Sequence, residues 1–258
     1  MNIKNIIKNL FGVNNIKFVK SWFVSSNEKI LIEQRRIFYN QFLKPGSVFF
    51  DIGANYGNRI EPLVNDNIKI IAIEPQIECV RYLRKKYGKK ITILQNGVGE
   101  ENKTQLMYIS TNANILSSFS KDWIDSTKKS GRFKKINWDK TRKIEMITLD
   151  SLIETYGKPD FIKIDVEGFE LEVLKGLSQK VNVLSLEYTV PERKEALVDC
   201  LRYLNNLSNS NVLFNYCITE NTEFALPQWV DFNELLEVVN TNAFLNTQFG
   251  DVYVKFNQ

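Results

Sequence analysis

Short apolar runs typical of buried β-strands alternate with helical segments along most of this chain. The strand-like runs are SVFFDIG, IKIIAIEP, ITILQ, TQLMYIS, KIEMITLD, PDFIKIDVE, VNVLSLEY, NVLFNY and DVYVKF. Apolar residues at helical spacing mark segments 27–42, 77–87, 191–207 and 232–239, and shorter helices are expected at 58–64 and after PDFIKIDVE. Pro62 and Pro191 are expected in the first turns of their helices. The alternation predicts an α/β fold of parallel strands joined by helical crossovers, in a sheet covered on both faces.

The length of 258 residues suits one domain with a helical extension. We expect the extension over residues 1–44, the domain over 45–258, and a polar, lysine-rich insertion over 111–142. The insertion is either a lid over bound ligands or an ordinary surface excursion. Its notable residues are Ser117, Ser118, Trp123, Phe133 and Trp138.

The first residues of the chain have one apolar helical face. This face is formed by Ile3, Ile6, Ile7, Leu10 and Phe11. Interruption by Asn and Lys argues against a signal peptide. Such a helix either packs on the domain or on a second subunit, giving a homodimer, or makes a peripheral contact with a membrane. No apolar run approaches the ~20 residues needed to cross a bilayer, so no transmembrane segment is expected.

Composition excludes several kinds of chemistry. The chain has no histidine, which excludes a histidine triad, a histidine base and a histidine-ligated metal. The net charge of +4 is weak and spread along the chain, so nucleic acid is not an expected partner. The scattered cysteines Cys79, Cys200 and Cys217 fit buried thiols in a reducing cytosol, and we expect a cytoplasmic protein.

A glycine-containing turn, DIGANYG, directly follows the first strand of the expected domain. Gly53 allows a sharp turn and close approach of the backbone to a ligand, while Gly57 allows close packing on the following helix. The spacing is not the dinucleotide fingerprint, and the Lys-[ST] ending of a phosphate-binding loop is missing. Alone, the glycine pair is as consistent with a simple tight turn as with a ligand site.

Polar residues end the next two strands. Glu74 follows the second strand, where a carboxylate can accept hydrogen bonds from both hydroxyls of a ribose. Asn96 follows the third strand, where it either bonds an adenine edge or caps a turn. An acidic loop and an acidic ribose partner without a phosphate cradle indicate an adenosyl ligand that lacks a pyrophosphate. S-adenosylmethionine fits that description.

Several segments of the sequence, taken together, resemble the FkbM-family methyltransferases. The matching segments, in order, are DIGANYGNRI, IIAIEPQIECVRYL, LMYIS with LSSFS, MITLDSLI, PDFIKIDVEGFELEVLKGL, LSLEY and the closing FGDVYV. The resemblance spans roughly residues 45–256, and the KIDVEGFELEVLKGL block is its most specific part. It implies a class I, seven-stranded Rossmann-like methyltransferase domain with a reversed last hairpin and S-adenosylmethionine as methyl donor. Characterised members mostly methylate hydroxyl oxygens on natural products or glycans.

The resemblance also implies roles for single residues. Asp51, Gly53, Asn55 and Gly57 should surround the methionine part of the donor and Glu74 its ribose. One position departs from the family pattern. Ile60 stands where Ser or Thr is common, which removes a hydroxyl near the loop.

The KIDVEG block supplies the candidate catalytic residues Lys163, Asp165 and Glu167. The period of two along a strand places all three on one side, with the two acids beside the expected donor. Without histidine, we expect Asp165 to be the base or to orient the substrate, with Glu167 supporting it or contacting substrate. Alternatively, Lys163 neutralises both acids in a buried charge network. Glu187, at the end of LSLEY, is expected near the same cleft.

Three functions remain open from the sequence. The favoured one is O-methylation of a hydroxyl on a glycan or small-molecule acceptor. The alternatives are N-methylation, which needs no strong base, and a non-catalytic domain that binds the cofactor or a partner. A carboxylate pair also attracts divalent cations. No ligand set is defined by the sequence, so no metal is expected.

Overall fold

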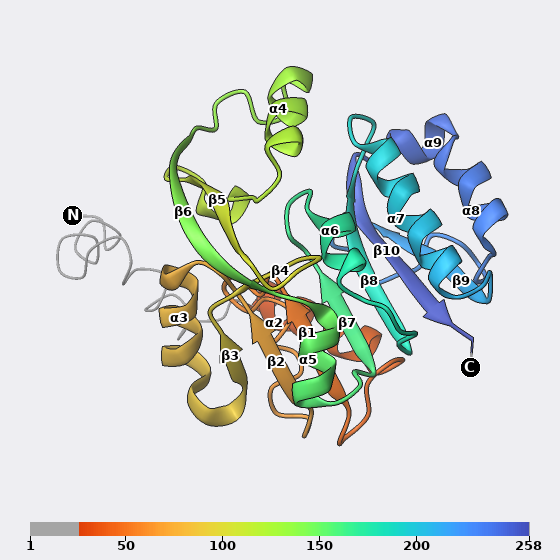
Figure 1. Ribbon diagram of the computed structural model, residues 1–258. Helices are drawn as coiled ribbons and strands as arrows, with labels where there is room; N and C mark the ends of the chain where they lie inside the picture. Colours follow the sequence, from red (N-terminus) through yellow and green to blue (C-terminus); the bar gives the residue numbers. More distant parts are fainter. Residues whose placement is uncertain (1–25, 258) are drawn as a thin grey trace.

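A computed structural model describes residues 26–257 and contains a seven-stranded sheet at its centre (Figure 1). Its strand order is β3-β2-β1-β7-β8-β10-β9. All neighbouring strands pair in parallel except β10, which is antiparallel to both β8 and β9. The bounds are β1 Val48–Ile52, β2 Lys69–Ile73, β3 Thr92–Leu94, β7 Phe161–Ile164, β8 Val183–Thr189, β9 Val212–Ile218 and β10 Phe249–Phe256. The mostly parallel sheet with a reversed last hairpin is confirmed.

Helices cover both faces of the sheet, as the alternation of segments predicts. One face packs in a hydrophobic core with α5, α6, α7, α8 and α9, and the other with α2 and α3. The burial is nearly complete, since Phe49 and Phe50 of β1 point to opposite faces and neither is exposed to solvent. The bounds are α2 Ser26–Tyr39, α3 Ile77–Tyr87, α5 Leu149–Tyr156, α6 Glu170–Lys175, α7 Lys194–Leu207, α8 Phe232–Val239 and α9 Asn242–Leu245.

Two proline-based expectations were wrong. Segment 58–64 forms consecutive turns and no helix, with hydrogen bonds that span three residues in some places and four in others. Pro62 cannot donate an N–H to extend a regular ladder, while Ile60 and Leu63 anchor the segment in the core. Helix α7 begins at Lys194, so Pro191 lies in the turn before the helix.

A second, three-stranded sheet stands beside the first and carries the insertion. It contains β4 (Gly97–Val98), β6 (Trp138–Ile147) and β5 (Thr104–Ser110) in that order. The expected insertion 111–142 holds the 3-10 turn η2 (Asn114–Leu116) and helix α4 (Lys121–Ser130), which projects above the sheets in Figure 1. Its last five residues belong to β6, so the strand is longer than KIEMITLD suggested.

The expected N-terminal extension is only partly covered by the structure. Helix α2 lies within residues 1–44 and packs on the sheet through Phe38 and Tyr39. The apolar face formed by Ile3 to Phe11 lies outside the described residues. Within residues 26–257, no helix is long and apolar enough to cross a membrane.

Candidate active site

A cavity of about 220 Å³ lies at the carboxyl ends of the central strands. It brings together most of the residues that sequence reasoning selected. The lining includes Asp51, Gly53, Asn55, Glu74, Asn96, Asp165, Glu167 and Glu187. Gly57 and Lys163 are not part of this lining. Parallel strands explain the convergence, because their carboxyl ends meet at one edge of the sheet.

The turn after β1 is shaped by its glycines. Gly53 has φ +83°, and a Cβ there would lie 1.9 Å from the carbonyl oxygen of Asp165, so only glycine fits. Gly57 has φ +78° and faces Leu83 and Tyr87 of α3, which gives the close helix packing expected of it. Ile60 is completely buried in the core below the turn and is not part of the cavity lining.

Glu74 is buried beneath this turn and is hydrogen-bonded on both carboxylate oxygens. Oε2 accepts from the backbone N–H of Asn55 and Oε1 from that of Gln76, each at 2.8 Å. Burial raises the pKa of Glu74 to about 7, and the two backbone hydrogen bonds oppose the shift. Each oxygen keeps a second acceptor direction for a ligand hydroxyl.

Asp51 supplies a carboxylate oxygen that lacks a partner. Its side chain is 2% exposed, and Oδ2 has no hydrogen-bond donor anywhere in residues 26–257. Burial raises the pKa of Asp51 to about 7, against the opposing charge of Lys163. A buried acceptor without a donor is costly, so this oxygen fits a ligand that brings an N–H or O–H.

Asn96 lines the same cavity but already has one structural role. Its side-chain amide donates to the backbone carbonyl of Glu145 in β6, at 3.1 Å. This contact joins the end of the third strand to the second sheet. Asn96 therefore has a structural hydrogen bond to the backbone, whether or not it also contacts an adenine.

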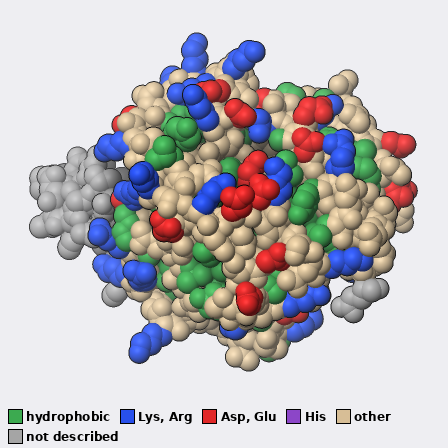
Figure 2. All heavy atoms as spheres, in the orientation of Figure 1, with side chains coloured by type: hydrophobic (Ala, Val, Ile, Leu, Met, Phe, Trp, Pro, Cys, Tyr) green, Lys and Arg blue, Asp and Glu red, His purple; other side chains and the backbone are tan. Residues whose placement is uncertain are grey.

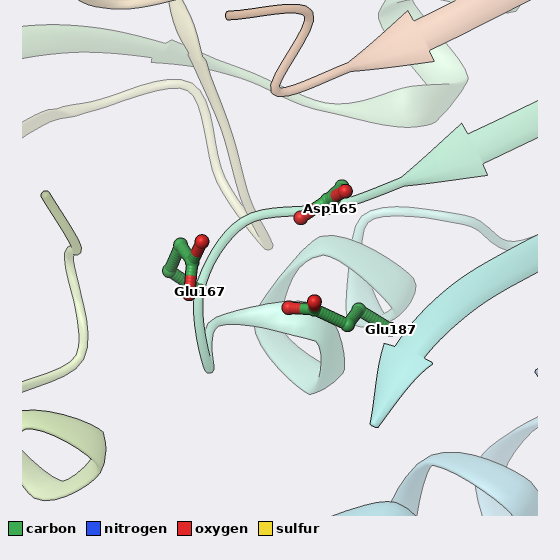
Figure 3. A group of neighbouring side chains, drawn as sticks. All are labelled: Asp165, Glu167 and Glu187. Atoms are coloured by element: carbon green, nitrogen blue, oxygen red, sulfur yellow. The ribbon is translucent and has the colours of Figure 1, made fainter. Parts of the chain in front are cut away.

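Three carboxylates gather opposite the glycine turn. Asp165 and Glu167 come from the loop after β7 and Glu187 from the end of β8, as Figure 3 shows. One oxygen of each lies within 4.8 Å of the others, so the three could hold a cation together. Figure 2 shows acidic side chains gathered near the middle of this face with basic ones beside them. Burial, and next the charge of Asp165, raises the pKa of both Glu167 and Glu187 well above the ordinary range.

Glu167 lies beside Asp165, but a turn places it there and not the alternation of side chains along a strand. Strand β7 ends at Ile164, and Glu167 has φ +54°, so it belongs to a tight turn. The insertion holds this turn from outside. The Ser118 hydroxyl donates to the carbonyl of Glu167 at 2.7 Å, and the Trp123 ring lies where a Cβ on Gly168 would be.

A buried ion pair supports the cluster from below. Lys163 is 0% exposed, and its Nζ donates to Asp251 Oδ1 at 2.9 Å and to Asp165 Oδ2 at 3.3 Å. Burial lowers the pKa of Lys163, but the charges of Asp165 and Asp251 outweigh it and raise that pKa overall. Arg59 adds a longer contact to Asp251 at 3.8 Å.

Asp251 and Arg59 were missed by sequence reasoning. Asp251 is the charged residue in the otherwise apolar start of β10, and it pairs in register with Glu187 of β8. An acid in a buried strand next to LSLEY was the available signal. Arg59 carried no such signal, because it lies in a segment that was expected to be helical.

Strand order, the reversed β10 and a ligand cavity at the carboxyl ends together define a class I methyltransferase fold. The chain belongs to the FkbM methyltransferase family, whose domain model (Methyltransferase FkbM domain) matches residues 51–245. It is therefore an S-adenosylmethionine-dependent methyltransferase.

Several solved methyltransferase structures are similar to this chain at low sequence identity. The TehB-like SAM-dependent methyltransferase from Corynebacterium glutamicum has a TM-score of 0.48 at 7% identity, over 94% of this chain and 98% of that one. The precorrin-6y C5,15-methyltransferase from Geobacter metallireducens GS-15 has a TM-score of 0.41 at 12% identity, over 91% of both chains. The plantazolicin methyltransferase BpumL, in complex with SAH, has a TM-score of 0.42 at 11% identity, over 99% of both chains. No curated protein matched the sequence.

Proposed function

We propose that this methyltransferase transfers a methyl group to a hydroxyl oxygen of a glycan or a small natural product. The supporting observation is the group of three carboxylates, Asp165, Glu167 and Glu187, in the cavity that also contains the Asp51 turn. A hydroxyl must lose its proton when it is methylated, and this chain has no histidine to take it. Carboxylates beside the donor supply that missing proton acceptor.

The donor would be held by the turn after β1 and by Glu74. The unpartnered Oδ2 of Asp51 would accept a hydrogen bond from the donor's ammonium group, and Glu74 would accept from the ribose hydroxyls. Gly53 and Asn55 would keep the backbone close to the methionine part, with Asn96 near the adenine. Gly57 would support this turn through its packing on α3.

In the proposed transfer, the sulfonium carbon–sulfur bond breaks as the new carbon–oxygen bond forms. The products are S-adenosylhomocysteine and a methyl ether. Asp165, held by Lys163, would orient the hydroxyl, and the released proton would pass to the Glu167–Glu187 pair. A raised pKa strengthens an ionised carboxylate as a base, so the proton acceptor would be the member of this pair that is ionised when the hydroxyl reacts. Lys163 would act through Asp165 as a positioning residue.

The proposed transfer needs no metal ion, because the carboxylates alone can orient the hydroxyl and accept its proton. A divalent cation on Asp165, Glu167 and Glu187 is the competing arrangement, since all three offer oxygen ligands. Exhaustive chelation decides between them. Full turnover after chelation is the expected result, and loss of turnover that Mg²⁺ restores would contradict it.

The decisive test compares Asp165→Asn with the unaltered enzyme. Deuterated-methyl S-adenosylmethionine is supplied to an extract of cells that lack the gene, and labelled products are sought by mass spectrometry. We expect labelled methyl ethers, a loss of about 10²–10⁴-fold in rate for the variant, and unchanged S-adenosylhomocysteine affinity by calorimetry. Methylated amines would establish the N-methylation alternative, and an unfolded variant would make the residue structural.

We also propose a small-molecule or glycan acceptor in preference to nucleic acid, and a cytoplasmic location. The weak net charge of +4 supports the first. For the second, the three cysteine side chains are all buried and no disulfide joins them within residues 26–257. Sedimentation of the full chain, with and without residues 1–25, would test the expected homodimer, and vesicle flotation would test the peripheral membrane contact.

A further inference from the structure

A second hollow, of about 270 Å³, adjoins the donor cavity. It lies between α4 of the insertion, α6, the end of β8 and the start of α7. Glu187 lines both spaces, so one carboxylate faces the donor cavity and the hollow together. Anything held in the hollow is therefore a neighbour of the three-carboxylate group.

Two residues that line the hollow each carry a buried N–H group without an acceptor. Nε1 of Trp123, a side chain only 1% exposed, and Nε of Arg193 have no hydrogen-bond partner in the described part of the chain. Trp138, the neighbouring indole in the insertion, is satisfied by the carbonyl of Leu116 at 2.7 Å. A buried donor without an acceptor costs about 1–3 kcal/mol of stability. Both N–H groups would therefore gain from an oxygen acceptor supplied by a ligand.

The same hollow is acidic, with Glu170 and Glu187 among its lining residues. Glu170 accepts from the backbone N–H of Gly168 at 3.1 Å, and burial raises its pKa to about 7. Further acids, Glu172, Glu195 and Asp199, extend along its wall. These acids outnumber Arg193, the one cationic residue among the described residues of this lining, so the hollow disfavours an anion despite its N–H groups.

Donors and acceptors in one hollow restrict the chemistry of its ligand. An ammonium group only donates hydrogen bonds, so it would leave Trp123 and Arg193 unsatisfied. A carboxylate or phosphate only accepts, and meets the surrounding acids. A hydroxyl group both donates and accepts, so a neutral unit with several hydroxyls can bond both the N–H donors and the carboxylate acceptors of the hollow.

The insertion, which contributes Trp123 to the hollow, is held in place by two sets of contacts. Trp123 packs edge-on against Trp138, with ring centroids 6.1 Å apart, and lies directly on Gly168. At the far end of the insertion, Arg132 forms an ion pair with Glu192 and donates to the carbonyl of Val190 at 2.8 Å. These contacts hold the insertion over the end of β8 and the start of α7.

We propose, building on the hydroxyl transfer proposed above, that this hollow is an acceptor subsite for a neutral polyhydroxylated unit such as a sugar residue. The bound unit accepts hydrogen bonds from Trp123 Nε1 and Arg193 Nε and donates to Glu170 and Glu187. The hydroxyl to be methylated is on the adjoining part of the acceptor, on the donor side of Glu187. The subsite thus selects acceptors at least two units long.

The indole N–H signals of the isotope-labelled full chain offer a direct test. Methyl glycosides of glucose, galactose, mannose and rhamnose are titrated, with and without S-adenosylhomocysteine, and ethanolamine and acetate serve as charged probes. We expect at least one glycoside to shift the Trp123 signal saturably, while the signal of Trp229, packed in the core on the other sheet face, stays in place. Trp123→Phe identifies the signal and should weaken glycoside binding about tenfold.

A second pair of variants keeps the test independent of Trp123. Ala196→Phe on α7 fills the hollow and should abolish glycoside binding, whereas Asn206→Phe, exposed near the other end of α7, should not. The proposal is overturned if no glycoside moves the Trp123 signal, if only ethanolamine does, or if Trp123→Phe binds glycosides as tightly as the parent, which would mean that water satisfies the indole.

Failure of this subsite is distinguishable from failure of the proposed function. Binding of S-adenosylhomocysteine without any glycoside binding would remove the subsite and leave methyl transfer to a hydroxyl intact. Glycoside binding at Trp123 together with exclusively N-methylated products would retain the subsite and overturn the transfer to oxygen.

Discussion

The donor and acceptor sides proposed for the cavity are built in different ways. On the donor side, Asp51 lies near the end of β1, Gly53 directly follows β1 and Glu74 directly follows the neighbouring β2. The two backbone N–H groups that bind Glu74 belong to the same stretch of chain. On the acceptor side, the turn that carries Glu167 is held by Ser118 and Trp123 from the insertion. Asp165 is held through Lys163, which Asp251 of the last strand binds. The donor side is therefore local in sequence, and the acceptor side is assembled from remote segments. A donor that is always the same suits a local motif, while remote segments can vary with the acceptor.

The largest effect is expected where the two sides touch. Gly53→Ala would place a Cβ 1.9 Å from the carbonyl oxygen of Asp165, a backbone atom that cannot move aside. We expect a loss of more than about 4 kcal/mol in the free energy of unfolding, and no S-adenosylhomocysteine binding. Gly46→Ala is the control, since Gly46 also has positive φ but nothing within 4 Å, and should cost about 1–2 kcal/mol. Equal costs in urea unfolding would show that backbone conformation alone matters at Gly53.

The acceptor side should depend on one buried ion pair. Asp251→Asn removes the closest partner of the completely buried Lys163 and leaves a poorly compensated charge. We expect a loss of about 3 kcal/mol in stability and a large fall in turnover. Asp199→Asn, whose exposed pair with Arg202 spans 2.7 Å, should change stability by less than about 0.5 kcal/mol. If both variants unfold at the same urea concentration, Lys163 and Asp251 do not stabilise the site.

The donor side should respond in affinity. Glu74→Gln replaces one acceptor oxygen by an NH₂ group, which cannot accept a hydrogen bond, so one of the two backbone N–H groups, that of Asn55 or that of Gln76, loses its acceptor. We expect S-adenosylhomocysteine to bind about 10- to 100-fold more weakly by calorimetry. Glu78→Gln, on the exposed start of α3, is the matched control and should bind normally. A normal affinity for Glu74→Gln would remove this residue from the donor site.

Donor binding should also be accompanied by proton release from the donor side. The pKa of both Asp51 and Glu74 is raised to about 7, so near that pH each carboxyl is partly protonated in the free enzyme. A donor ammonium and ribose hydroxyls favour the ionised forms, so binding should release roughly one proton near pH 7 and almost none at pH 9. Affinity for S-adenosylhomocysteine should therefore rise with pH up to about 7 and then level off.

Calorimetry in buffers of different ionisation enthalpy measures this proton release directly. Glu74→Gln should reduce the number of protons released, because one of the two titrating groups is gone. Release that is unchanged in this variant, or proton uptake in the unaltered enzyme, would show that Glu74 does not titrate with the donor.

The same contrast explains what the sequence could and could not predict. Strand ends hold Asp51, Glu74 and Asp165, and a parallel sheet brings such ends together whatever the details of packing. Glu167 was placed correctly beside Asp165 for an incomplete reason, because a positive-φ turn carries it there instead of an extended strand. The partnership of Lys163 with Asp251 spans 88 positions and depends on the register of β10, which local patterns do not determine.

The smallest effect is expected from the hydroxyl that ties the insertion to the acceptor side. Ser118→Ala removes the hydrogen bond to the carbonyl of Glu167 and a second one from the backbone N–H of Ser120 within the insertion, but no contact with the donor turn. We expect turnover to fall about three- to tenfold at unchanged S-adenosylhomocysteine affinity, since the neutral hydrogen bond to Glu167 contributes about 1 kcal/mol. Ser126→Ala, which only loses a bond to the backbone of its own helix, should leave turnover unaltered. If Ser118→Ala instead weakens donor binding and spares turnover, the insertion supports the donor side, and the division into a local and an assembled half is wrong.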